Sequence, residues 1–301
     1  MKDKVFLIGG SGFVGKHIVS DWYGQYDISV FDRFIDADFF AQYPNVNCHV
    51  VDVTKDTIPE DVPNPDYIVN LASTMVTADR NLTGIGDLVK ENLDIITRLF
   101  VRFKDDDKLK LFVQFGTMEE YGPGNPPLNE QMREQPNSAY SLMKQTCTNY
   151  TMMLAHNEGL PACVVRPANL FGKGQHPQRF VPYVLHQLKE NLPIDVTPCE
   201  QKRDFIHIDD FVFLLQKVLK KSEPFVGEIV NLSSGKSLAL KDIIGCLQKE
   251  TGSKSVVNYG ALPYRDGEVM DLCCDNSHLM KLLGENIEIN TLEKLIHYAN
   301  E

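Results

Sequence analysis

Short apolar runs recur along the first half of the chain, and segments with helical spacing separate them. Two long helices are predicted, one around 88–100, where apolar residues recur every three or four positions, and one over 139–157. Buried strands are predicted at 5–8, 28–31, 47–51, 67–71, 111–115 and 161–166. Strands that alternate with helices are typical of a doubly wound parallel sheet, whose ligands bind at the carboxyl ends of the strands. The pattern therefore predicts an α/β fold.

The pattern changes after residue 171. An apolar strand at 228–232 is expected to return to the main sheet, whereas the remainder, from 237 onward, consists of short helices broken by glycine and proline. This texture suits a smaller C-terminal lobe that closes over a ligand. We therefore expect a main domain over 1–172, rejoined by about 204–235, and a smaller lobe over 173–203 and 236–301.

The composition narrows the classes of partner. The chain has 301 residues, of which 43% are hydrophobic and 24% charged, and its net charge is −11. No nucleic-acid partner is expected, because binding to a phosphate backbone requires a basic face. No membrane span is expected, since no run approaches about 20 apolar residues. Seven cysteines without a C-x-x-C spacing suggest neither disulfides nor zinc, so we expect a cytoplasmic protein.

The first predicted strand enters a turn that is rich in glycine. Gly9, Gly12 and Gly15 occupy this turn, and a helical pattern follows at once. Glycines let the backbone come close to a phosphate, and the first amides and the dipole of a helix attract its negative charge. The turn therefore predicts a nucleotide site.

Two kinds of nucleotide turn fit these residues. Gly10, Gly15 and Lys16 match part of a triphosphate-binding loop, but His17 stands where that loop needs a hydroxyl for magnesium. A dinucleotide site instead needs an acid at the tip of the second strand, where it bonds the adenosine ribose, and Asp32 stands there. We therefore predict a Rossmann-type dinucleotide-binding domain over 1–172.

Tyr140 and Lys144 form the most specific pair of candidate catalytic residues. They lie four residues apart on a predicted helix and therefore share one face. A tyrosine normally keeps its proton up to about pH 10, but a fixed cation beside it stabilises the phenolate. Such a phenol can act as an acid or a base near neutral pH.

These features resemble the extended short-chain dehydrogenase/reductase family, in its nucleotide-sugar branch, and the resemblance runs nearly from end to end. Besides the glycine turn and the Tyr140 helix, the matching segments are NLAS at 70–73, RPANLFG at 166–172, QKRDFIHIDD at 201–210, NLSSG at 231–235 and RDGEV at 265–269. The resemblance implies NAD as the cofactor, with NADP as an alternative if Arg33 turns toward a 2′-phosphate. The residues that it implies for cofactor binding are Gly9, Gly12, Phe13, Val14, Gly15, Asp32, Arg33, Asp52, Val53, Leu71, Ala72, Ser73, Asn92, Tyr140 and Lys144.

By the same resemblance, the partner is a nucleoside-diphosphate sugar, bound by the smaller lobe. The residues implied for this substrate are Thr74, Thr117, Asn169, Arg179, Arg203 and Arg265. No metal is expected, because His207, Asp209 and Asp210 fit a strand end and a helix start better than a set of metal ligands. The family also implies a homodimer, in which the helices around Leu93 and Tyr140 pair as a four-helix bundle.

The segment FGTMEEYG at 115–122 corresponds to the loop that decides the reaction in this family. Thr117 completes a catalytic triad with Tyr140 and Lys144, in which Tyr140 moves a proton while hydride passes between the sugar C4 and the nicotinamide. The resemblance thus implies an oxidoreductase that acts at C4.

Three reactions share this triad, and the residues that distinguish them are the next two, Met118 and Glu119. Glu119 stands where 4,6-dehydratases resembling this chain have a glutamate that removes the C5 proton, but Met118 replaces their second acid. The 4-epimerases usually carry a small or apolar residue in place of Glu119. The segment most resembles reductases of 4-keto-6-deoxy sugar nucleotides, and this is the predicted activity. A dehydratase or epimerase with tightly bound NAD remains the alternative, and a dinucleotide sensor without chemistry a remote one.

Overall fold

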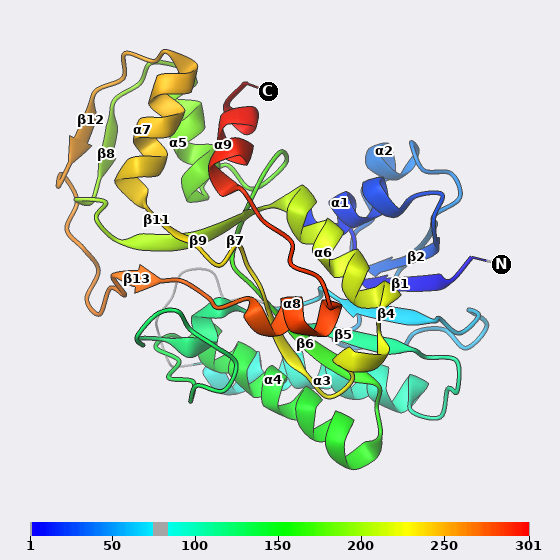
Figure 1. Ribbon diagram of the computed structural model, residues 1–301. Coiled ribbons are helices and arrows are strands. Elements are labelled where there is room, and N and C mark those ends of the chain that lie inside the picture. Colours follow the sequence, from blue (N-terminus) through cyan, green and yellow to red (C-terminus); the bar gives the residue numbers. More distant parts are fainter. Residues whose placement is uncertain (1, 75–83, 301) are drawn as a thin grey trace. The chain divides into compact units, whose positions relative to one another are not determined.

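The computed structural model describes residues 2–74 and 84–300 (Figure 1). The chain forms two compact units, each assembled from separate stretches of sequence. The first unit comprises the described parts of Met1–Gly122 together with Arg133–Arg166 and Val212–Val230. The second comprises Pro123–Met132, Pro167–Phe211 and Asn231–Glu301.

The first unit is built around a parallel sheet of seven strands, in the order β10-β6-β5-β4-β1-β2-β3. The strands are β1 (Lys4–Ile8), β2 (Asp27–Asp32), β3 (Asn47–Val50), β4 (Tyr67–Asn70), β5 (Leu111–Phe115), β6 (Ala162–Pro167) and β10 (Ile229–Leu232). The central strands are buried almost throughout, as expected for a sheet covered on both faces. This topology confirms the predicted Rossmann-type fold, and its strand order reverses between β1 and β4.

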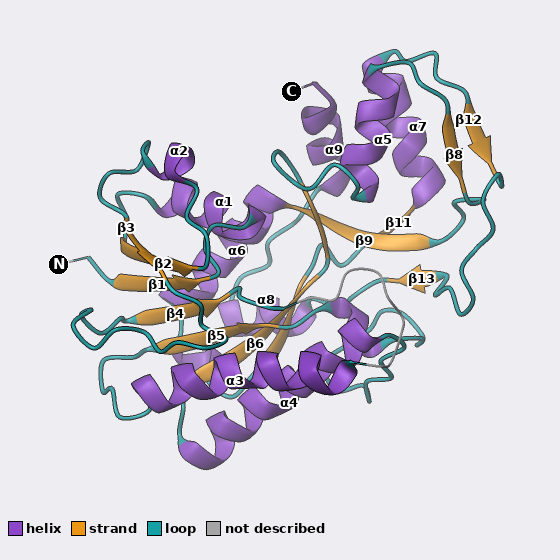
Figure 2. Ribbon diagram, turned by 180° about the vertical axis from the view of Figure 1, so that it is seen from behind, coloured by secondary structure: helices purple, strands orange, loops and turns teal. Residues whose placement is uncertain are grey.

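Helices cover both faces of this sheet. The long helices α3 (Ile85–Phe103) and α4 (Ala139–Glu158) lie side by side on one face, and α1 (Phe13–Trp22) lies on the other (Figure 2). The side chains between α3, α4 and the sheet form one apolar core, which includes Phe112, Ile96 and Met143. The remaining elements are α2 (Ala37–Phe40), the 3₁₀ helices η1 (Met118–Tyr121) and η2 (Glu223–Phe225), and α6 (Ile208–Lys220). None of the helices in the described part of the chain is long and apolar enough to cross a membrane.

The described part of the second unit contains two small sheets and four helices, three of which pack around its own core. In the larger sheet β9 pairs with three partners, β7, β11 and β13, and in the smaller one β8 pairs with β12. Its elements are β7 (Asn169–Phe171), α5 (Phe180–Lys189), β8 (Ile194–Val196), β9 (Lys202–His207), β11 (Ser237–Ala239), α7 (Leu240–Thr251), β12 (Val257–Tyr259), β13 (Asp271–Leu272), α8 (Ser277–Leu283) and α9 (Thr291–Asn300). Side chains of α5, α7 and α9 meet those of β9 in the core.

Asp204 of β9 connects three segments of the second unit. Its carboxylate is fully buried and accepts hydrogen bonds from the Ser234 amide (3.1 Å), the Ser234 hydroxyl (2.7 Å), the Gly235 amide (3.2 Å) and the Cys274 amide (3.4 Å). Burial outweighs these donors and raises the pKa of Asp204 from 3.8 to about 6. One side chain therefore holds the 233–235 loop and the segment after β13 against the central strand of the sheet.

Asp204→Asn is expected to destabilise the protein by about 1–3 kcal/mol at pH 7, where the side chain is mostly ionised. The amide nitrogen would face two of the four donors, and buried amides without an acceptor are unfavourable. Asp271→Asn is the matched control, because the Asp271 carboxylate lies in the same sheet and accepts only one side-chain hydrogen bond, from the Ser237 hydroxyl. Urea unfolding followed by circular dichroism measures both variants, and equal losses would contradict this role of Asp204.

The stability difference between wild type and Asp204→Asn is expected to depend on pH. With a pKa of about 6 in the folded state, Asp204 holds its proton more tightly there than in the unfolded chain. Its contribution to stability is therefore greatest below about pH 4 and falls as the pH rises through 6. The stability difference between wild type and Asp204→Asn should shrink by about 2–3 kcal/mol from pH 4 to pH 7. A difference that grows with pH would contradict the prediction.

Candidate active site

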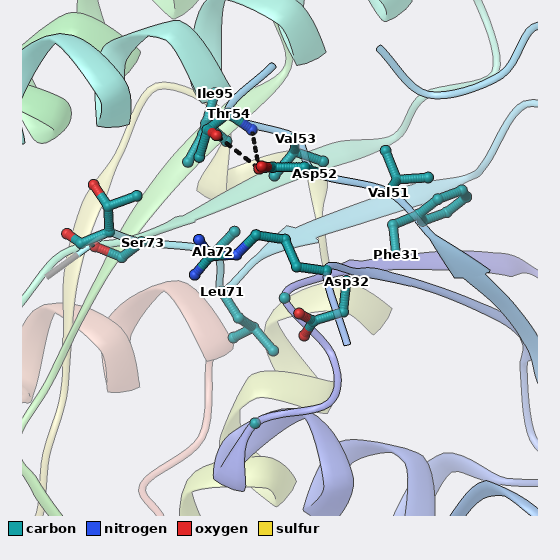
Figure 3. Close-up of a pocket in the computed structure, with 14 residues that line it drawn as sticks. Phe31, Asp32, Val51, Asp52, Val53, Thr54, Leu71, Ala72, Ser73 and Ile95 are labelled. Carbon is teal, nitrogen blue, oxygen red and sulfur yellow. Dashed lines mark hydrogen bonds between the residues drawn. The ribbon is translucent and has the colours of Figure 1, made fainter. Parts of the chain in front are cut away.

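A pocket of the first unit lies at the carboxyl ends of β1, β2, β3 and β4, where the strand order reverses (Figure 3). Such a position is the usual ligand site of a doubly wound sheet. Nine of the residues predicted for the cofactor line it, namely Gly9, Gly12, Asp32, Arg33, Asp52, Val53, Leu71, Ala72 and Ser73. Thr74, predicted for the substrate, lines the same pocket.

Two glycines of the turn after β1 are required by close packing. Gly9 has a positive φ of 77°, and a Cβ there would lie 2.7 Å from the Ala72 amide nitrogen. A Cβ on Gly15 would lie 2.3 Å from the Gly10 carbonyl oxygen. Any side chain at either position would push apart the turn, α1 and the segment after β4.

Gly12 has a different role, since a Cβ there would meet nothing closer than 3.7 Å. It is the N-cap of α1, and no side chain caps this helix end. Phe13 and Val14 are the first two residues of the helix, and their amides belong to its N-terminal turn. The beginning of α1 is therefore suited to a phosphate group, which would bond the uncapped amides and benefit from the helix dipole.

Two carboxylates lie on the wall of the pocket (Figure 3). Asp32 ends β2, and its carboxylate accepts a hydrogen bond from the Ser11 amide at 3.0 Å. Asp52 accepts from the Thr54 hydroxyl at 2.6 Å and from the Thr54 amide at 3.2 Å, and these bonds hold the pKa of Asp52 below its ordinary value. Both oxyanions are thus fixed by the chain and can bond the hydroxyl or amino groups of a nucleoside.

Asn92 of α3 does not line the pocket but fixes one of its walls. The Asn92 side-chain oxygen accepts from the Ser73 hydroxyl at 3.0 Å and the Thr74 amide at 3.1 Å. Its nitrogen donates to the Thr74 hydroxyl at 2.7 Å and to the Leu88 carbonyl at 2.8 Å. Asn92 therefore affects the pocket indirectly, because it holds Ser73 and Thr74 of the segment that follows β4.

Lys144 lies in the interior of the first unit. It belongs to α4, and its ammonium donates to the Phe115 carbonyl at 3.1 Å, while burial lowers its pKa. Tyr140 is half-buried one turn earlier on the same helix, which begins at Ala139 behind the N-cap Ser138. The helix thus presents both residues of the predicted pair on one face, next to the end of β5.

Thr117 stands between β5 and η1 and is buried. Its hydroxyl oxygen accepts from the Glu119 amide at 3.3 Å and so caps η1. With one lone pair engaged in this way, the hydroxyl can donate its hydrogen to a ligand oxygen. Thr117 therefore lies two residues after Phe115, whose carbonyl accepts the hydrogen bond from Lys144.

The three residues after Thr117 have very different surroundings. Met118 is buried, Glu119 is exposed, and Glu120 is fully buried in an ion pair with Arg166. Glu119 was the acid expected to matter, whereas no role was predicted for Glu120 by itself. From the sequence, Glu120 looks like another surface residue, because a 3₁₀ helix of four residues is too short to show a hydrophobic periodicity.

Four further residues that line the pocket were not predicted from the sequence, namely Phe31, Val51, Thr54 and Ile95. A signal existed for two of them. Thr54 follows Asp52 at the spacing of a local side-chain turn, and Ile95 lies one helical turn after Asn92.

The other residues predicted for the substrate belong to the second unit. The Asn169 side chain donates to the Asp204 carbonyl at 3.0 Å. Arg203 donates to the Val269 carbonyl at 2.7 Å and forms an ion pair with Glu268, while Arg179 and Arg265 are exposed. The positive charge of Arg203, one of the three predicted arginines, is therefore already neutralised by the Glu268 carboxylate. Among residues 2–74 and 84–300, no group of three or more His, Cys, Asp or Glu side chains is placed to hold a metal ion.

Comparisons with known proteins agree with this geometry. Residues 5–233 match the model of the NAD dependent epimerase/dehydratase family. The chain is 30% identical to CDP-abequose synthase of Salmonella muenchen, over 93% of this chain and 91% of that protein. It is 24% identical to dTDP-4-dehydro-6-deoxyglucose reductase of Escherichia coli, over 86% and 85%.

Among solved structures, the fold is similar to UDP-glucuronic acid 4-epimerase from Bacillus cereus in complex with UDP-glucuronic acid and NAD. The TM-score is 0.88 at 21% identity, and the match covers 99% of this chain and 98% of that one. At this identity the likeness supports the fold.

Asp32→Asn is expected to weaken NADH binding about tenfold, because a charge-assisted hydrogen bond to the ribose would be lost. NADPH binding should weaken less or improve, since the repulsion of a 2′-phosphate by Asp32 would also disappear. Asp36→Asn is the matched control, because Asp36 forms an ion pair with Lys16 and does not line the pocket. Fluorescence titration with both cofactors measures the effect. Equal losses for NADH and NADPH would contradict the assignment.

Proposed function

Because this chain belongs to the NAD-dependent epimerase/dehydratase family, we propose that it is an oxidoreductase that reduces the 4-keto group of a nucleoside-diphosphate 4-keto-6-deoxyhexose. The observation that carries the proposal is that one unit holds both the pocket at the glycine turn and the predicted triad. Lys144 binds the Phe115 carbonyl, two residues before Thr117, and Tyr140 precedes Lys144 on the same helix. NAD is the cofactor of this family, and the uncapped start of α1 and the carboxylate of Asp32 fit it.

In the proposed reaction, bound NADH supplies a hydride to C4 of the sugar. The Thr117 hydroxyl donates a hydrogen bond to the ketone oxygen and orients it. The Tyr140 phenol gives its proton to the same oxygen as it becomes a hydroxyl. The Lys144 ammonium, fixed on the Phe115 carbonyl, stabilises the phenolate that remains.

The surroundings of Met118 and Glu119 support reduction over dehydration. A 4,6-dehydration needs an acid for the leaving hydroxyl and a base for the C5 proton. Met118 can be neither and points into the core, while Glu119 is exposed. The relatives named above include one reductase of a 4-dehydro-6-deoxy sugar nucleotide, which agrees with this choice. Because Glu119 is present, a 4,6-dehydratase is the alternative function. A 4-epimerase, which would use the same triad, is the other alternative.

We propose that the second unit binds the sugar nucleotide. Arg179 and Arg265 are exposed and can turn toward a diphosphate, and Arg203 can join them by exchanging its partner Glu268. Asn169 stands on β7, which pairs with β9, the strand that carries Arg203. In the first unit, Thr74 and Thr117 would contact the sugar.

A homodimer in the cytoplasm is part of the same proposal. Val101 of α3 and Leu142 and Met153 of α4 are exposed large apolar side chains on the two long helices that lie side by side. Apolar side chains on such a face favour pairing with a second copy through a four-helix bundle. Sedimentation velocity measures the oligomeric state.

Absorbance at 340 nm with a panel of substrates tests the reaction. Purified protein, NADH and the dTDP-, CDP- and UDP-linked 4-keto-6-deoxyhexoses are combined, and mass spectrometry identifies the product. A reductase consumes one NADH per sugar and adds two hydrogens. A dehydratase given the parent hexose nucleotides would release water without net consumption of NADH, and an epimerase would change neither mass nor absorbance. Either of these results would replace the proposal.

Tyr140→Phe is expected to lower kcat by about 10²–10⁴-fold, because the proton donor is removed. NADH affinity should stay within about twofold, since the ring and the helix remain. Tyr150→Phe is the control on the same helix, because the Tyr150 hydroxyl bonds the Thr97 hydroxyl at 2.9 Å on α3. Turnover that survives in Tyr140→Phe would refute the assigned role.

Glu119→Gln is expected to change kcat by less than about threefold, because an exposed carboxylate has no part in the proposed reduction. The same assay measures it. A loss of two orders of magnitude would point to the dehydratase, in which this carboxylate is the base.

A further inference from the structure

Two buried side chains of opposite charge hold the segment 115–117, which ends at the proposed catalytic hydroxyl. The Lys144 ammonium donates to the Phe115 carbonyl at 3.1 Å, and the Glu120 carboxylate accepts from the Thr117 amide at 2.8 Å. Both side chains are buried, Glu120 completely. Hydrogen bonds to charged groups are shorter and stronger than those between neutral ones. The segment is therefore fixed by a cation before Gly116 and an anion after it.

Gly116 shows how closely Glu120 approaches this segment. A Cβ on Gly116 would lie 2.4 Å from the Glu120 Oε1 atom, which is closer than any real contact of that kind. The Gly116 amide also donates to the Val165 carbonyl of β6 at 2.8 Å. The carboxylate thus lies directly against backbone that β6 already holds.

Arg166 fixes the second oxygen of the same carboxylate. Its Nε and Nη2 atoms lie 3.0 and 2.8 Å from Glu120 Oε2, and Nη2 also lies 2.7 Å from Glu134 Oε1. The guanidinium lies over the ring of Tyr121, 4.6 Å from its centroid. Because Arg166 is rigidly placed on a buried strand, it sets both the position and the orientation of Glu120.

We propose that Glu120, held by Arg166, is a positioning residue that places the Thr117 hydroxyl for reaction. The inference rests on the proposed function, in which that hydroxyl binds the ketone oxygen. A displacement of a catalytic group by about 1 Å can lower a rate about 10²-fold. Stability alone does not account for the pair, because a buried ion pair is often no more stable than well-packed apolar residues in its place.

Glu120→Gln tests the proposal, with Glu134→Gln as the matched control. The Thr117 amide bonds Oε1 and the guanidinium bonds Oε2, so in glutamine one of these donors would face an NH₂ group, which cannot accept. We expect kcat to fall about 10–100-fold with whichever 4-keto-6-deoxyhexose nucleotide of the panel wild type reduces, while NADH affinity is unchanged. Glu134→Gln removes a carboxylate from the same guanidinium, and within the described residues Glu134 makes no hydrogen bond to 115–117, so kcat should stay within about threefold. Unchanged kcat in Glu120→Gln would overturn the proposal.

A double-mutant cycle separates positioning from a general structural effect. If Glu120 acts through the Thr117 hydroxyl, Glu120→Gln should cause less than about threefold further loss in a Thr117→Ala background. If the two losses multiply, Glu120 acts by another route and the proposal fails. Should Glu120→Gln not fold, Glu120→Asp replaces it, since the shorter side chain keeps the charge but not the reach.

Hydrogen exchange of the Thr117 amide tests the placement without any substrate. Glu120→Gln should speed exchange of this amide at least about tenfold, and Glu134→Gln should not, because only Glu120 accepts from it. If wild type reduces none of the sugar nucleotides, the proposed function fails. The exchange measurement still decides whether Glu120 holds Thr117 in place. Unchanged exchange in Glu120→Gln would overturn it.

Discussion

The fold of the first unit depends on one close approach, between the turn after β1 and the segment after β4. No atom larger than hydrogen can stand between the Gly9 α-carbon and the Ala72 amide, since a Cβ would lie 2.7 Å from it. The approach brings together the carboxyl ends of the two strands at which the strand order reverses. The pocket, the start of α1 and the wall that Asn92 fixes are all consequences of it. The geometry of the pocket is therefore set by backbone, and side chains such as Asp32 line it.

A second constraint governs the chemistry. β5 must deliver Thr117 to the same edge of the sheet, and the backbone that leaves a strand end is normally mobile. Here Lys144, Glu120 and β6 remove that freedom by bonding three successive residues of the segment. Lys144 thus has a structural role as well as the electrostatic one expected from its spacing to Tyr140. A buried ammonium with a lowered pKa and a fixed acceptor is suited to both.

The sequence predicted the sheet well because its signals are local. Apolar runs bounded by turns located the strands, and the glycine turn with Asp32 located a pocket, which is the proposed cofactor site. Contacts between distant residues could not be predicted in this way. The bond from Asn92 to Thr74 spans 18 residues and the pair of Arg166 with Glu120 spans 46, and neither leaves a periodic trace. Glu119 and Glu120 are adjacent acids in the sequence, and only packing makes one exposed and the other buried.

The pair of Arg203 with Glu268 changes what the second unit can contribute to binding. By the family resemblance, three arginines were expected among the residues that bind the sugar nucleotide, in an otherwise acidic chain. Arg203 already has a carboxylate partner, so a phosphate that reaches it exchanges one charge-assisted hydrogen bond for another and gains little. In the proposed binding mode, most of the net attraction for the diphosphate would come from Arg179 and Arg265, which are exposed, and from the release of the Glu268 carboxylate into water. Glu268 would also weaken the attraction of Arg203 for unrelated anions, which would favour a ligand that engages several arginines at once.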